Sequence, residues 1–312
     1  MFAIGIDVGG TKIAAGLVDD AGHVERQLER PTPAKVAGNT SATIVAMAQE
    51  LARGEQVSGI GIGAAGFTAA DRRTVTYAPN LEWRSEPLGD IVSRDTGVPV
   101  VVENDANAAA WGEYRFGAAR GTKNTLVVTL GTGIGGGIIV DGKLLRGAQG
   151  FAGEIGHMQI KAGGRRCGCG NRGCWERYGS GTALVNEARE MVSVAPDVAY
   201  HLLDLADGKV ENITGKMVSQ AAAEGDVVAL DILETVAKWI GQGLANLTAI
   251  LDPEVIVLAG GMAEAGDLLL DPIRSAFKKN LPVRRFRKVV EIKSAELGAL
   301  AGLIGAADLS RI

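Results

Sequence analysis

The sequence predicts an α/β protein with a duplicated architecture, and two observations lead to this fold class. Short apolar segments with the spacing of strands alternate along the chain with longer segments of helical spacing, which is the order typical of α/β folds. In addition, a unit of two apolar strands separated by a glycine-rich turn occurs at residues 2–18 and again at residues 125–140. A repeat at a pitch of roughly 120 residues is too long for a solenoid and suits a duplicated domain.

The first glycine hairpin begins with the strand 2–8, FAIGIDV, which carries Asp7 near its end. Its turn, residues 9–12 (GGTK), leads into a second apolar strand. Such a turn offers backbone amides, a hydroxyl and an ammonium group to an anion. It is not a Walker loop, because that motif runs into a helix as GxxxxGK[ST]. Taken alone, the pattern is also compatible with an ordinary glycine hairpin.

Residues 125–140, TLVVTLGTGIGGGIIV, repeat this design, and an Asp-containing turn closes both hairpins, at 19–22 and at 141–142. The repeat favours a shared role over the simpler alternative of two unrelated hairpins. Two glycine hairpins that face each other could hold a polyphosphate between them.

The strand predicted at 99–103, PVVVE, runs into Asn104 and Asp105, and strong helix formers follow at 106–114. Asp105 is therefore expected at a strand end and at the N-cap of a helix. Open α/β sheets bind ligands at the carboxyl ends of their strands, and the helix dipole should keep the pKa of Asp105 low. An ionised Asp105 could accept a proton; a simple capping aspartate is the alternative.

The other elements follow from the spacing of apolar residues and from the turn residues between them. Helices are expected at 41–53, 88–96, 179–194 (capped by Ser180), 198–206, 214–223, 226–251, 268–279 and 295–307, strands at 57–63, 254–258 and 289–293, and a loop at 77–83 with Pro79, Asn80 and Trp83. The strand 254–258 leads into Gly260 and Gly261, a junction that could receive a nucleobase or ribose. The last helix is rich in glycine and alanine, so it can pack closely.

All three cysteines lie within eight residues, at Cys167, Cys169 and Cys174, separated by glycines that allow tight turns. With His157 as the natural fourth ligand, they form the closed set of a structural zinc site. Free thiols in a flexible loop are the alternative, and a disulfide is disfavoured because the count is odd and nothing suggests secretion. The spacing, His-x9-Cys-x-Cys-x4-Cys, differs from that of nucleic-acid-binding zinc fingers. We expect the zinc to shape the loop 153–176.

The composition excludes some classes of function. The chain has 312 residues, 46% of them hydrophobic, which suits two domains or one large α/β unit. A net charge of -4 argues against a general nucleic-acid or anionic-membrane surface. The basic run 284–288, RRFRK, is expected to be a solvated connection. We expect no signal peptide, because Asp7 interrupts the first apolar run, and no membrane span; the expected location is the cytoplasm.

Six motifs, DVGGTK, ENDANAAAWGE, LGTGIGGGI, GEIGH, CGCGNRGCWE and LAGG, in this order and over the whole chain, resemble the ROK family of bacterial sugar kinases. Within that family they are most similar to the ATP-dependent glucokinases of high-GC Gram-positive bacteria. The resemblance implies the actin-like ATPase fold, a duplicated ribonuclease-H-like unit with two lobes and a central cleft. It implies a small lobe, 1–107 plus 296–312, and a large lobe, 108–295, that carries the zinc-binding loop 157–174.

The resemblance also implies roles for individual residues in transferring a phosphoryl group from ATP to the 6-hydroxyl of glucose, with Mg2+ and a structural Zn2+ as cofactors. Asp105 would be the catalytic base. The sugar would be bound by Gly66, Asn80, Asn104, Asp105, Glu154, His157 and Glu176, and zinc by His157, Cys167, Cys169 and Cys174. The nucleotide would be bound by Gly5, Ile6, Asp7, Val8, Gly9, Gly10, Thr11 and Lys12, by Gly131, Thr132, Gly133, Ile134, Gly135, Gly136, Gly137 and Ile138, and by Gly260 and Gly261.

Three other functions stay open at this point. Relatives of the family include sugar-responsive repressors, which carry a helix-turn-helix segment ahead of the kinase-like part; this sequence begins directly on its first strand, so we expect an enzyme without such a segment. A kinase for N-acetylglucosamine, N-acetylmannosamine or fructose is the second, since the pocket near the sugar 2-position decides the substrate. A purely structural zinc protein is the third. The expected partners are a hexose and a second copy of the chain, in a dimer or tetramer, with no nucleic acid and no membrane.

Overall fold

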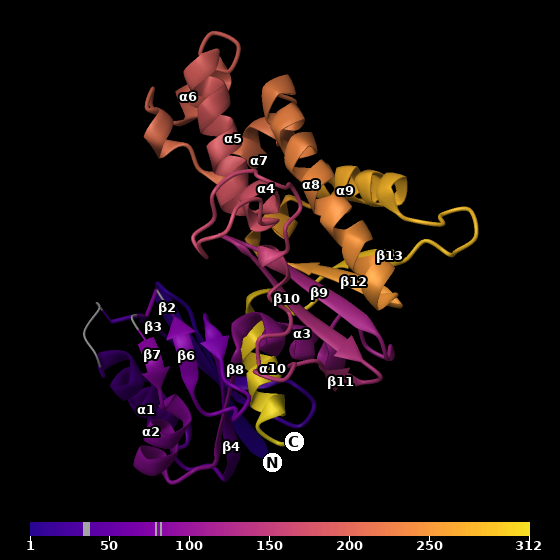
Figure 1. Ribbon diagram of the computed structural model, residues 1–312. Helices are drawn as coiled ribbons and strands as arrows, with labels where there is room; N and C mark the ends of the chain where they lie inside the picture. Colours follow the sequence, from indigo (N-terminus) through magenta and orange to yellow (C-terminus); the bar gives the residue numbers. More distant parts are fainter. Residues whose placement is uncertain (34–37, 79, 82) are drawn as a thin grey trace. The chain divides into compact units, whose positions relative to one another are not determined.

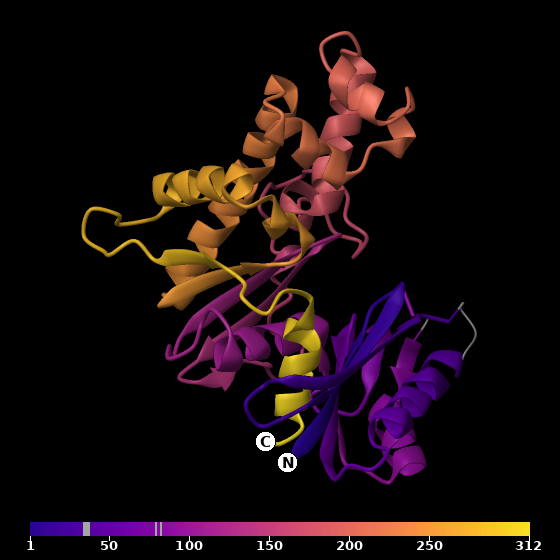
Figure 2. The same cartoon turned by 180° about the vertical axis from the view of Figure 1, so that it is seen from behind.

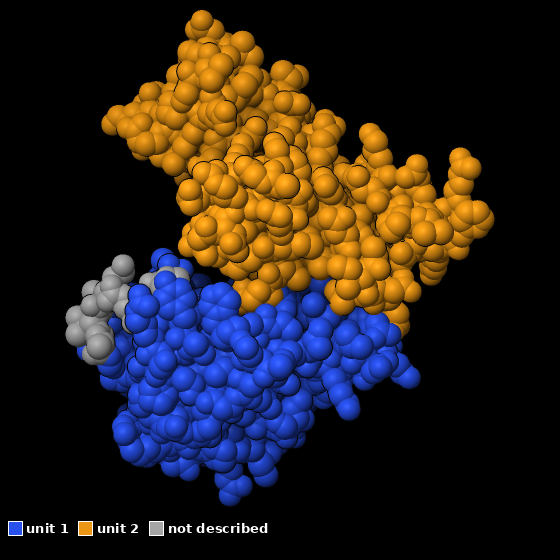
Figure 3. All heavy atoms as spheres, in the orientation of Figure 1, with its two compact units in different colours: residues 1–127, 136–153, 295–312 blue, residues 128–135, 154–294 orange. Residues whose placement is uncertain are grey.

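The computed structural model describes residues 1–33, 38–78, 80–81 and 83–312, and the chain divides into two compact units (Figure 3). Unit 1 comprises residues 1–127, 136–153 and 295–312, and unit 2 comprises residues 128–135 and 154–294. This division differs from the expected lobes, 1–107 with 296–312 and 108–295, chiefly in the placement of 108–127 and 136–153. The reason is the packing of helix α3 (Asp105–Phe116) against the C-terminal helix α10 (Ala301–Leu309), which keeps residues beyond 107 in unit 1.

The sheet of unit 1 has the strand order β3-β2-β1-β4-β8 (Figure 1). Strand β1 pairs with β2 as the expected antiparallel hairpin and runs parallel to β4, which in turn runs parallel to β8. The bounds are β1 Phe2–Val8, β2 Lys12–Val18, β3 Val24–Pro31, β4 Val57–Ala64 and β8 Val100–Asn104.

Side chains alternate between the two faces of β1, and each face buries a different set of helices. Ile4, Ile6 and Val8 form one core with residues of α1 (Asn39–Leu51) and α2 (Leu88–Thr96). Ala3, one residue earlier in the alternation, belongs to the cluster formed with α10. Alternate residues of the apolar run FAIGIDV therefore pack on opposite faces of the sheet, and both faces are buried.

Helix α10 lies close against the sheet because glycines face it (Figure 2). A Cβ on Gly5 would lie 1.8 Å from the carbonyl oxygen of Leu303, and one on Gly61 would lie 1.7 Å from that of Ala306. A Cβ on Gly305 would lie 1.8 Å from the carbonyl oxygen of Ala108 in α3. The close packing expected of the last helix is confirmed, and any larger side chain at these glycines would separate the layers.

A small sheet, β5-β6-β7, adds to unit 1 where a loop was expected at 77–83. Its strands are β5 Phe67–Thr68, β6 Val75–Ala78 and β7 Trp83–Glu86. Ala78 pairs with Trp83, which is buried, so the ends of the expected loop are strands. Pro79 and Glu82 lie outside the described residues.

The second large sheet has the order β11-β10-β9-β12-β13 and contains the second expected hairpin. Its strands are β9 Thr125–Leu130, β10 Ile134–Val140, β11 Lys143–Leu144, β12 Val255–Ala259 and β13 Glu291–Ser294. The helices of unit 2 are α4 Glu176–Gly179, α5 Gly181–Val194, α6 Tyr200–Leu205, α7 Gly215–Ala223, α8 Val227–Leu251 and α9 Asp267–Asn280.

Side-chain caps set the starts of three of these helices. Ser180, Thr214 and Asp226 each accept a hydrogen bond from a backbone N–H in the first turn of α5, α7 and α8, which is the usual role of these residue types at an N-cap. Ser180 therefore caps α5 as expected. Among the described residues, no helix combines the length and the apolar character that a bilayer crossing requires.

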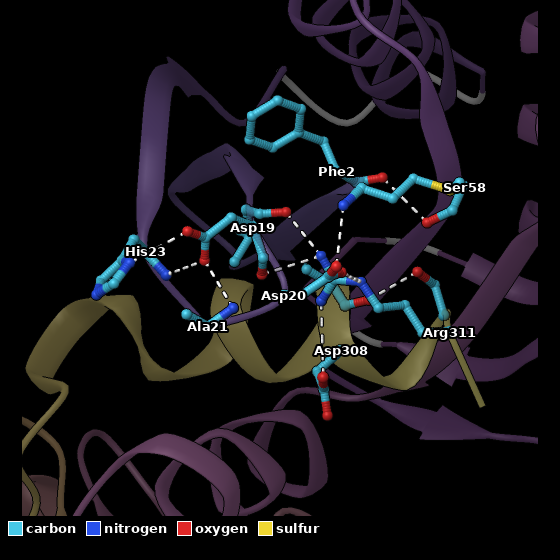
Figure 4. Close-up of polar contacts among 12 residues, drawn as sticks. Phe2, Asp19, Asp20, Ala21, His23, Ser58, Asp308 and Arg311 are labelled. Atoms are coloured by element: carbon cyan, nitrogen blue, oxygen red, sulfur yellow. Dashed lines mark hydrogen bonds and ion pairs between the residues drawn. The ribbon is translucent and has the colours of Figure 1, made fainter.

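Polar contacts hold the end of the chain to the first hairpin of unit 1, as Figure 4 shows. The guanidinium of Arg311 donates 2.7 Å and 3.1 Å hydrogen bonds to the carbonyl oxygens of Val18 and Asp19. The same group lies 3.4 Å from a carboxylate oxygen of Asp20 and 3.6 Å from one of Asp308. The C-terminal residues thus fasten α10 to the β1–β2 hairpin.

Candidate functional site

The first glycine turn, residues 9–12 of unit 1, is held from both sides. Gly9 N–H donates to the carbonyl oxygen of Lys12 at 3.0 Å, which closes the tight turn. Thr32, which follows β3, donates its N–H to the oxygen of Thr11 at 2.9 Å and its hydroxyl to the oxygen of Gly9 at 2.7 Å. Thr32 was missed by the sequence analysis, because β3 itself was not expected. Of the segment 5–12, Gly5, Ile6 and Val8 are buried in β1, so only the turn can present amides to a ligand.

Two charged side chains flank this turn. Lys12 Nζ donates to a carboxylate oxygen of Glu29 on β3 at 2.8 Å, so its charge is already partly balanced. The pKa of Asp7 is raised to about 7, chiefly by burial and also by the charge of Asp105, while the ammonium of Lys12 opposes the shift. A carboxyl group that is half-protonated near neutrality and lies beside an anion-binding turn is suited to a cation, whose charge would ionise it.

Asn104, and not Asp105, is the N-cap of α3, which corrects the expected position of the cap. The Asn104 side-chain oxygen accepts a 3.0 Å hydrogen bond from Asn107 N–H, and its amide nitrogen donates to the oxygen of Gly66 at 3.1 Å. Asp105 is the first residue of α3, and its carboxylate accepts a 2.9 Å hydrogen bond from Ala106 N–H. The carboxylate of Asp105 is therefore presented at the start of the helix by a cap one residue earlier.

The pKa of Asp105 is raised, whereas the helix dipole led us to expect a low value. Burial raises the pKa of Asp105 to about 6, and the backbone N–H groups of Ala106 and Asp105 itself oppose the shift without cancelling it. Desolvation of the carboxylate outweighs the helix N-terminus here. A carboxyl group with a pKa just below neutral pH is largely ionised at pH 7, which is the state that a general base requires.

Gly66 and Asn80, both expected to contact a sugar, lie close to these groups in unit 1. A Cβ on Gly66 would lie 2.6 Å from the carbonyl oxygen of Tyr77, so no larger residue fits there. A Cβ on Gly10 would lie 3.2 Å from the Asn80 Cβ, so Asn80 sits directly against the first glycine turn. The fold thus places Asn80, which is expected to bind the sugar, beside Gly10, which is expected to bind phosphate.

The second glycine turn, residues 131–133 of unit 2, lies at the N-terminus of helix α5 (Figure 1). Gly181 N–H donates to the oxygen of Gly131 at 2.8 Å, and the Thr182 hydroxyl donates to the oxygen of Thr132 at 2.7 Å. The dipole of a helix N-terminus favours a bound phosphate nearby. Further along β10, Gly137 is buried, and its missing side chain makes room for Ala110 of α3.

A cavity of about 1020 Å³ opens beside the second glycine turn, within unit 2. This volume is ample for a nucleotide. Gly261 lines the cavity as expected; Gly260 does not, and it instead forms a turn at φ 89° against the oxygen of Leu130. Polar side chains that the sequence analysis did not identify also line it, namely Thr182, Asn186, Arg189, Thr214, Lys216, Ser219 and Glu264. These residues come from α5, α7 and the segment after β12, and no short motif connects them.

The four expected zinc ligands come together in unit 2. One donor atom from each of His157, Cys167, Cys169 and Cys174 lies within 4.8 Å of the other three. The Cys169 and Cys174 sulfurs are 3.6 Å apart, and His157 Nδ1 is 3.7 Å from the Cys167 sulfur. Zinc–sulfur bonds of about 2.3 Å at tetrahedral angles place two sulfurs about 3.8 Å apart. The donor set and its dimensions therefore fit a structural zinc ion.

Glu176 connects the zinc-ligand cluster to the second glycine turn. One of its carboxylate oxygens accepts a 2.9 Å hydrogen bond from the Cys167 thiol. The other lies 2.9 Å from the position that a Cβ on Gly133 would occupy. Glu154 begins the short 3-10 helix Ile155–His157, and its carbonyl oxygen accepts the N–H of His157. Glu176 thus contacts the zinc-ligand cluster through its carboxylate, and Glu154 does so through its backbone carbonyl.

Comparison with known proteins finds full-length similarity. The model of the ROK family matches residues 3–311. The chain is 48% identical to the glucokinase of Streptomyces coelicolor over 309 residues, 99% of this chain and 97% of that protein. A ROK family glucokinase from Streptomyces griseus, solved in complex with glucose and AMPPNP, is similar with a TM-score of 0.90 at 48% identity, over 100% of this chain and 99% of that one. The xylose repressor of Bacillus subtilis is 30% identical over 99% of this chain and 76% of its own length.

Proposed function

The chain belongs to the ROK family, and on this premise we propose that it is an ATP-dependent glucokinase, which phosphorylates the 6-hydroxyl of glucose to yield glucose 6-phosphate. Its fold is the actin-like ATPase fold of the ROK sugar kinases. The observation that carries the proposal is the full-length identity of 48% to Streptomyces glucokinases in a chain that also presents Asp105 as a base with a pKa of about 6.

Phosphoryl transfer depends on positioning and on neutralising charge more than on covalent chemistry. Asp105 accepts the proton of the sugar 6-hydroxyl, and that oxygen attacks the γ-phosphorus of ATP in line while ADP leaves. The amides of the two glycine turns and the hydroxyls of Thr11 and Thr132 hold the phosphates. The cavity of unit 2 receives the nucleoside, with the N-terminus of α5 directed at phosphate.

Carboxylates, side-chain amides and an imidazole bind the sugar in this proposal. Glu154 and Glu176 accept hydrogen bonds from sugar hydroxyls, together with Asn80 and Asn104. His157 uses Nδ1 on the zinc side, since that nitrogen faces Cys167 at 3.7 Å, and its other nitrogen remains for the sugar. The zinc ion supplies a rigid link between His157 and the segment 167–174 when it is bound.

Mg2+ is the second expected cation, and Asp7 is the residue that suits it. Its carboxylate lies near the end of β1, close to the first glycine turn, and has the raised pKa described above. Carboxylate oxygens are the ligands that Mg2+ prefers, usually with several waters retained. When bound, the ion neutralises charge on the β- and γ-phosphate oxygens.

The pKa of Asp105 predicts the acid limb of the pH profile. The base works only when it is ionised, so kcat/KM for glucose should be level above about pH 7 and should fall below about pH 6. The fall approaches tenfold per pH unit, because one proton blocks the base. Initial rates between pH 4.5 and 8, with Tm measured across the same range, test this. A profile with no break above pH 5, in protein that stays folded, would contradict the assignment.

The substrate is tested by measuring ADP release from the purified protein with Mg-ATP and glucose, mannose, fructose, N-acetylglucosamine or N-acetylmannosamine. We expect turnover confined largely to glucose. Preference for an N-acetylated sugar would retain the kinase chemistry and replace the substrate. No turnover with any sugar, in protein that contains zinc, would favour a sugar-sensing role, which the similarity to xylose repressors makes the second candidate.

We also propose that the enzyme acts in the cytoplasm as a homo-oligomer, a dimer or a tetramer. Unit 2 exposes apolar side chains that a second copy could cover, among them Val194, Tyr200, Val227 and Ile250, which are 78%, 69%, 76% and 74% exposed. Isolated exposed apolar residues are common, but four such exposed side chains within one unit favour an interface.

A further inference from the structure

Glu103 is a buried carboxylate that the mechanism above does not use. It lies on β8, directly before Asn104 and Asp105, and is 3% exposed. The guanidinium of Arg146, in the segment after β11, donates a 2.6 Å hydrogen bond to one of its oxygens. A buried charge costs free energy unless it is paired and hydrogen-bonded, and Arg146 supplies this pairing for Glu103.

The second oxygen of Glu103 binds the segment that presents the base. It accepts 3.0 Å and 3.1 Å hydrogen bonds from Asn104 N–H and from the side-chain amide of Asn107. Asn107 is 1% exposed, and within the described residues its side-chain oxygen has no partner. The bond to Glu103 is thus the hydrogen bond by which the structure holds the Asn107 side chain. Asn107 N–H in turn donates to Asn104.

These contacts close a ring around Asp105. From Glu103 the ring passes to Asn107, from Asn107 to the Asn104 side chain, and from there through the chain back to Glu103. Asn104 also reaches out of the ring to the oxygen of Gly66. Asp105 lies inside the stretch that the ring encloses, so its backbone has little freedom. A rotation of the first turn of α3 would require one of these hydrogen bonds to break.

The backbone of Arg146 is also held by a hydrogen bond, which restricts the residue that pairs with Glu103. Its carbonyl oxygen accepts Ala152 N–H at 2.9 Å, which closes the segment 146–152. Burial lowers the pKa of Arg72, and the positive charge of Arg146 lowers it further. The negative charge of Glu103 opposes both effects. Glu103 is therefore ion-paired with Arg146, and its negative charge also acts on Arg72 in unit 1.

We propose that Glu103 is a positioning residue, whose carboxylate, paired with Arg146, holds Asn104 and the first turn of α3 so that Asp105 is aimed at the sugar hydroxyl. This inference rests on the proposed function. A reacting group that is displaced by about 1 Å can cost roughly a hundredfold in rate. Nucleotide binding, which uses the cavity of unit 2, does not depend on the ring.

The test is kinetic and uses Glu103→Gln, Arg146→Met and the double variant in the full-length protein. Glu103→Gln should lower kcat by roughly 10- to 100-fold and leave KM for ATP within about twofold. Because both residues act through one contact, the double variant should lose about as much as either single variant, and not the product of the two losses. Asn107→Ala, which leaves the ion pair in place, should also lower kcat and serves if Glu103→Gln does not fold.

Asp308→Asn is the matched control for a structural role. Asp308 is also a buried carboxylate of unit 1, 4% exposed, and it accepts hydrogen bonds from Trp111 and Arg115 at 2.8 Å and 3.0 Å (Figure 4 shows its contact with Arg311). This variant should lower Tm and leave kcat unchanged. Normal kcat in Glu103→Gln, or an equal loss of kcat in the control, would overturn the inference.

Failure of the proposed function would look different. The wild-type protein is assayed first on the sugar panel, and the variants are then compared on whichever sugar it phosphorylates. If it phosphorylates none, the glucokinase proposal fails, and calorimetric binding of glucose to wild type and Glu103→Gln becomes the measure. A weaker Kd in the variant would support the positioning of Asn104, whereas an unchanged Kd, or no binding to the wild type, would overturn it.

Discussion

Asp105→Asn should lower kcat for glucose phosphorylation by roughly 10²–10⁴-fold while glucose still binds. The amide has nearly the same shape as the carboxylate and can keep the hydrogen bond with Ala106 N–H through its oxygen, so α3 should start as before. What it lacks is a basic oxygen for the proton of the 6-hydroxyl. Burial disfavours the charged carboxylate, so the variant should be at least as stable as the wild type at neutral pH.

The measurement is kcat from initial rates, with glucose affinity by calorimetry and Tm for each protein. Asp226→Asn makes the same change at the N-cap of α8, where the carboxylate accepts Ala229 N–H at 2.8 Å, and should leave kcat near that of the wild type. Turnover within about threefold of wild type in Asp105→Asn would remove Asp105 from the role of base; a loss that came only from KM would reassign it to sugar binding.

Cys169→Ser should remove zinc and weaken glucose binding together. Three ligands hold a structural zinc poorly, and without the ion His157 and the cysteines no longer share a metal that fixes their positions. Glu176, which contacts Cys167 and lies against Gly133, would lose part of its support. We expect KM for glucose to rise by roughly 10- to 100-fold, the range seen when groups that orient ligands are lost.

Metal content by mass spectrometry and KM for glucose and ATP are measured on the same preparation. Arg172→Gln is the control, since it changes an exposed side chain of the same loop that is not a zinc ligand, and both zinc and KM should stay as in the wild type. If zinc is lost from Cys169→Ser and KM for glucose is unchanged, the loop does not carry the sugar site.

Much of the fold could be predicted because its elements are encoded locally. The hairpin 2–18, the strand 57–63 and the helix that begins after Ser180 each show their own periodicity and turn residues, and the structure confirms them. Strand β3, VERQLERP, was missed because it lies at the edge of its sheet and is largely exposed, so no apolar alternation marks it. The strands β6 and β7 were missed because each has only four residues, too few to show a clear period.

The zinc-ligand cluster was predictable for a different reason. Three cysteines and a histidine within 18 residues can meet without help from distant parts of the chain, so composition and spacing suffice. The cavity beside α5 was not predictable in the same way. Its polar lining combines Thr182 with Lys216 and Glu264, which are far apart in sequence and ordinary in type.

The sequence by itself determined the α/β class, the duplicated glycine hairpins, the zinc-ligand set and the candidate base, since each depends on residues that are neighbours in the chain. The tertiary structure alone decided the pKa of Asp105, the choice of Asn104 as the cap and the link from Glu103 to Arg146. Desolvation and ion pairing depend on which groups surround a side chain in space. Those groups come from distant parts of the chain, and only folding brings them next to the side chain.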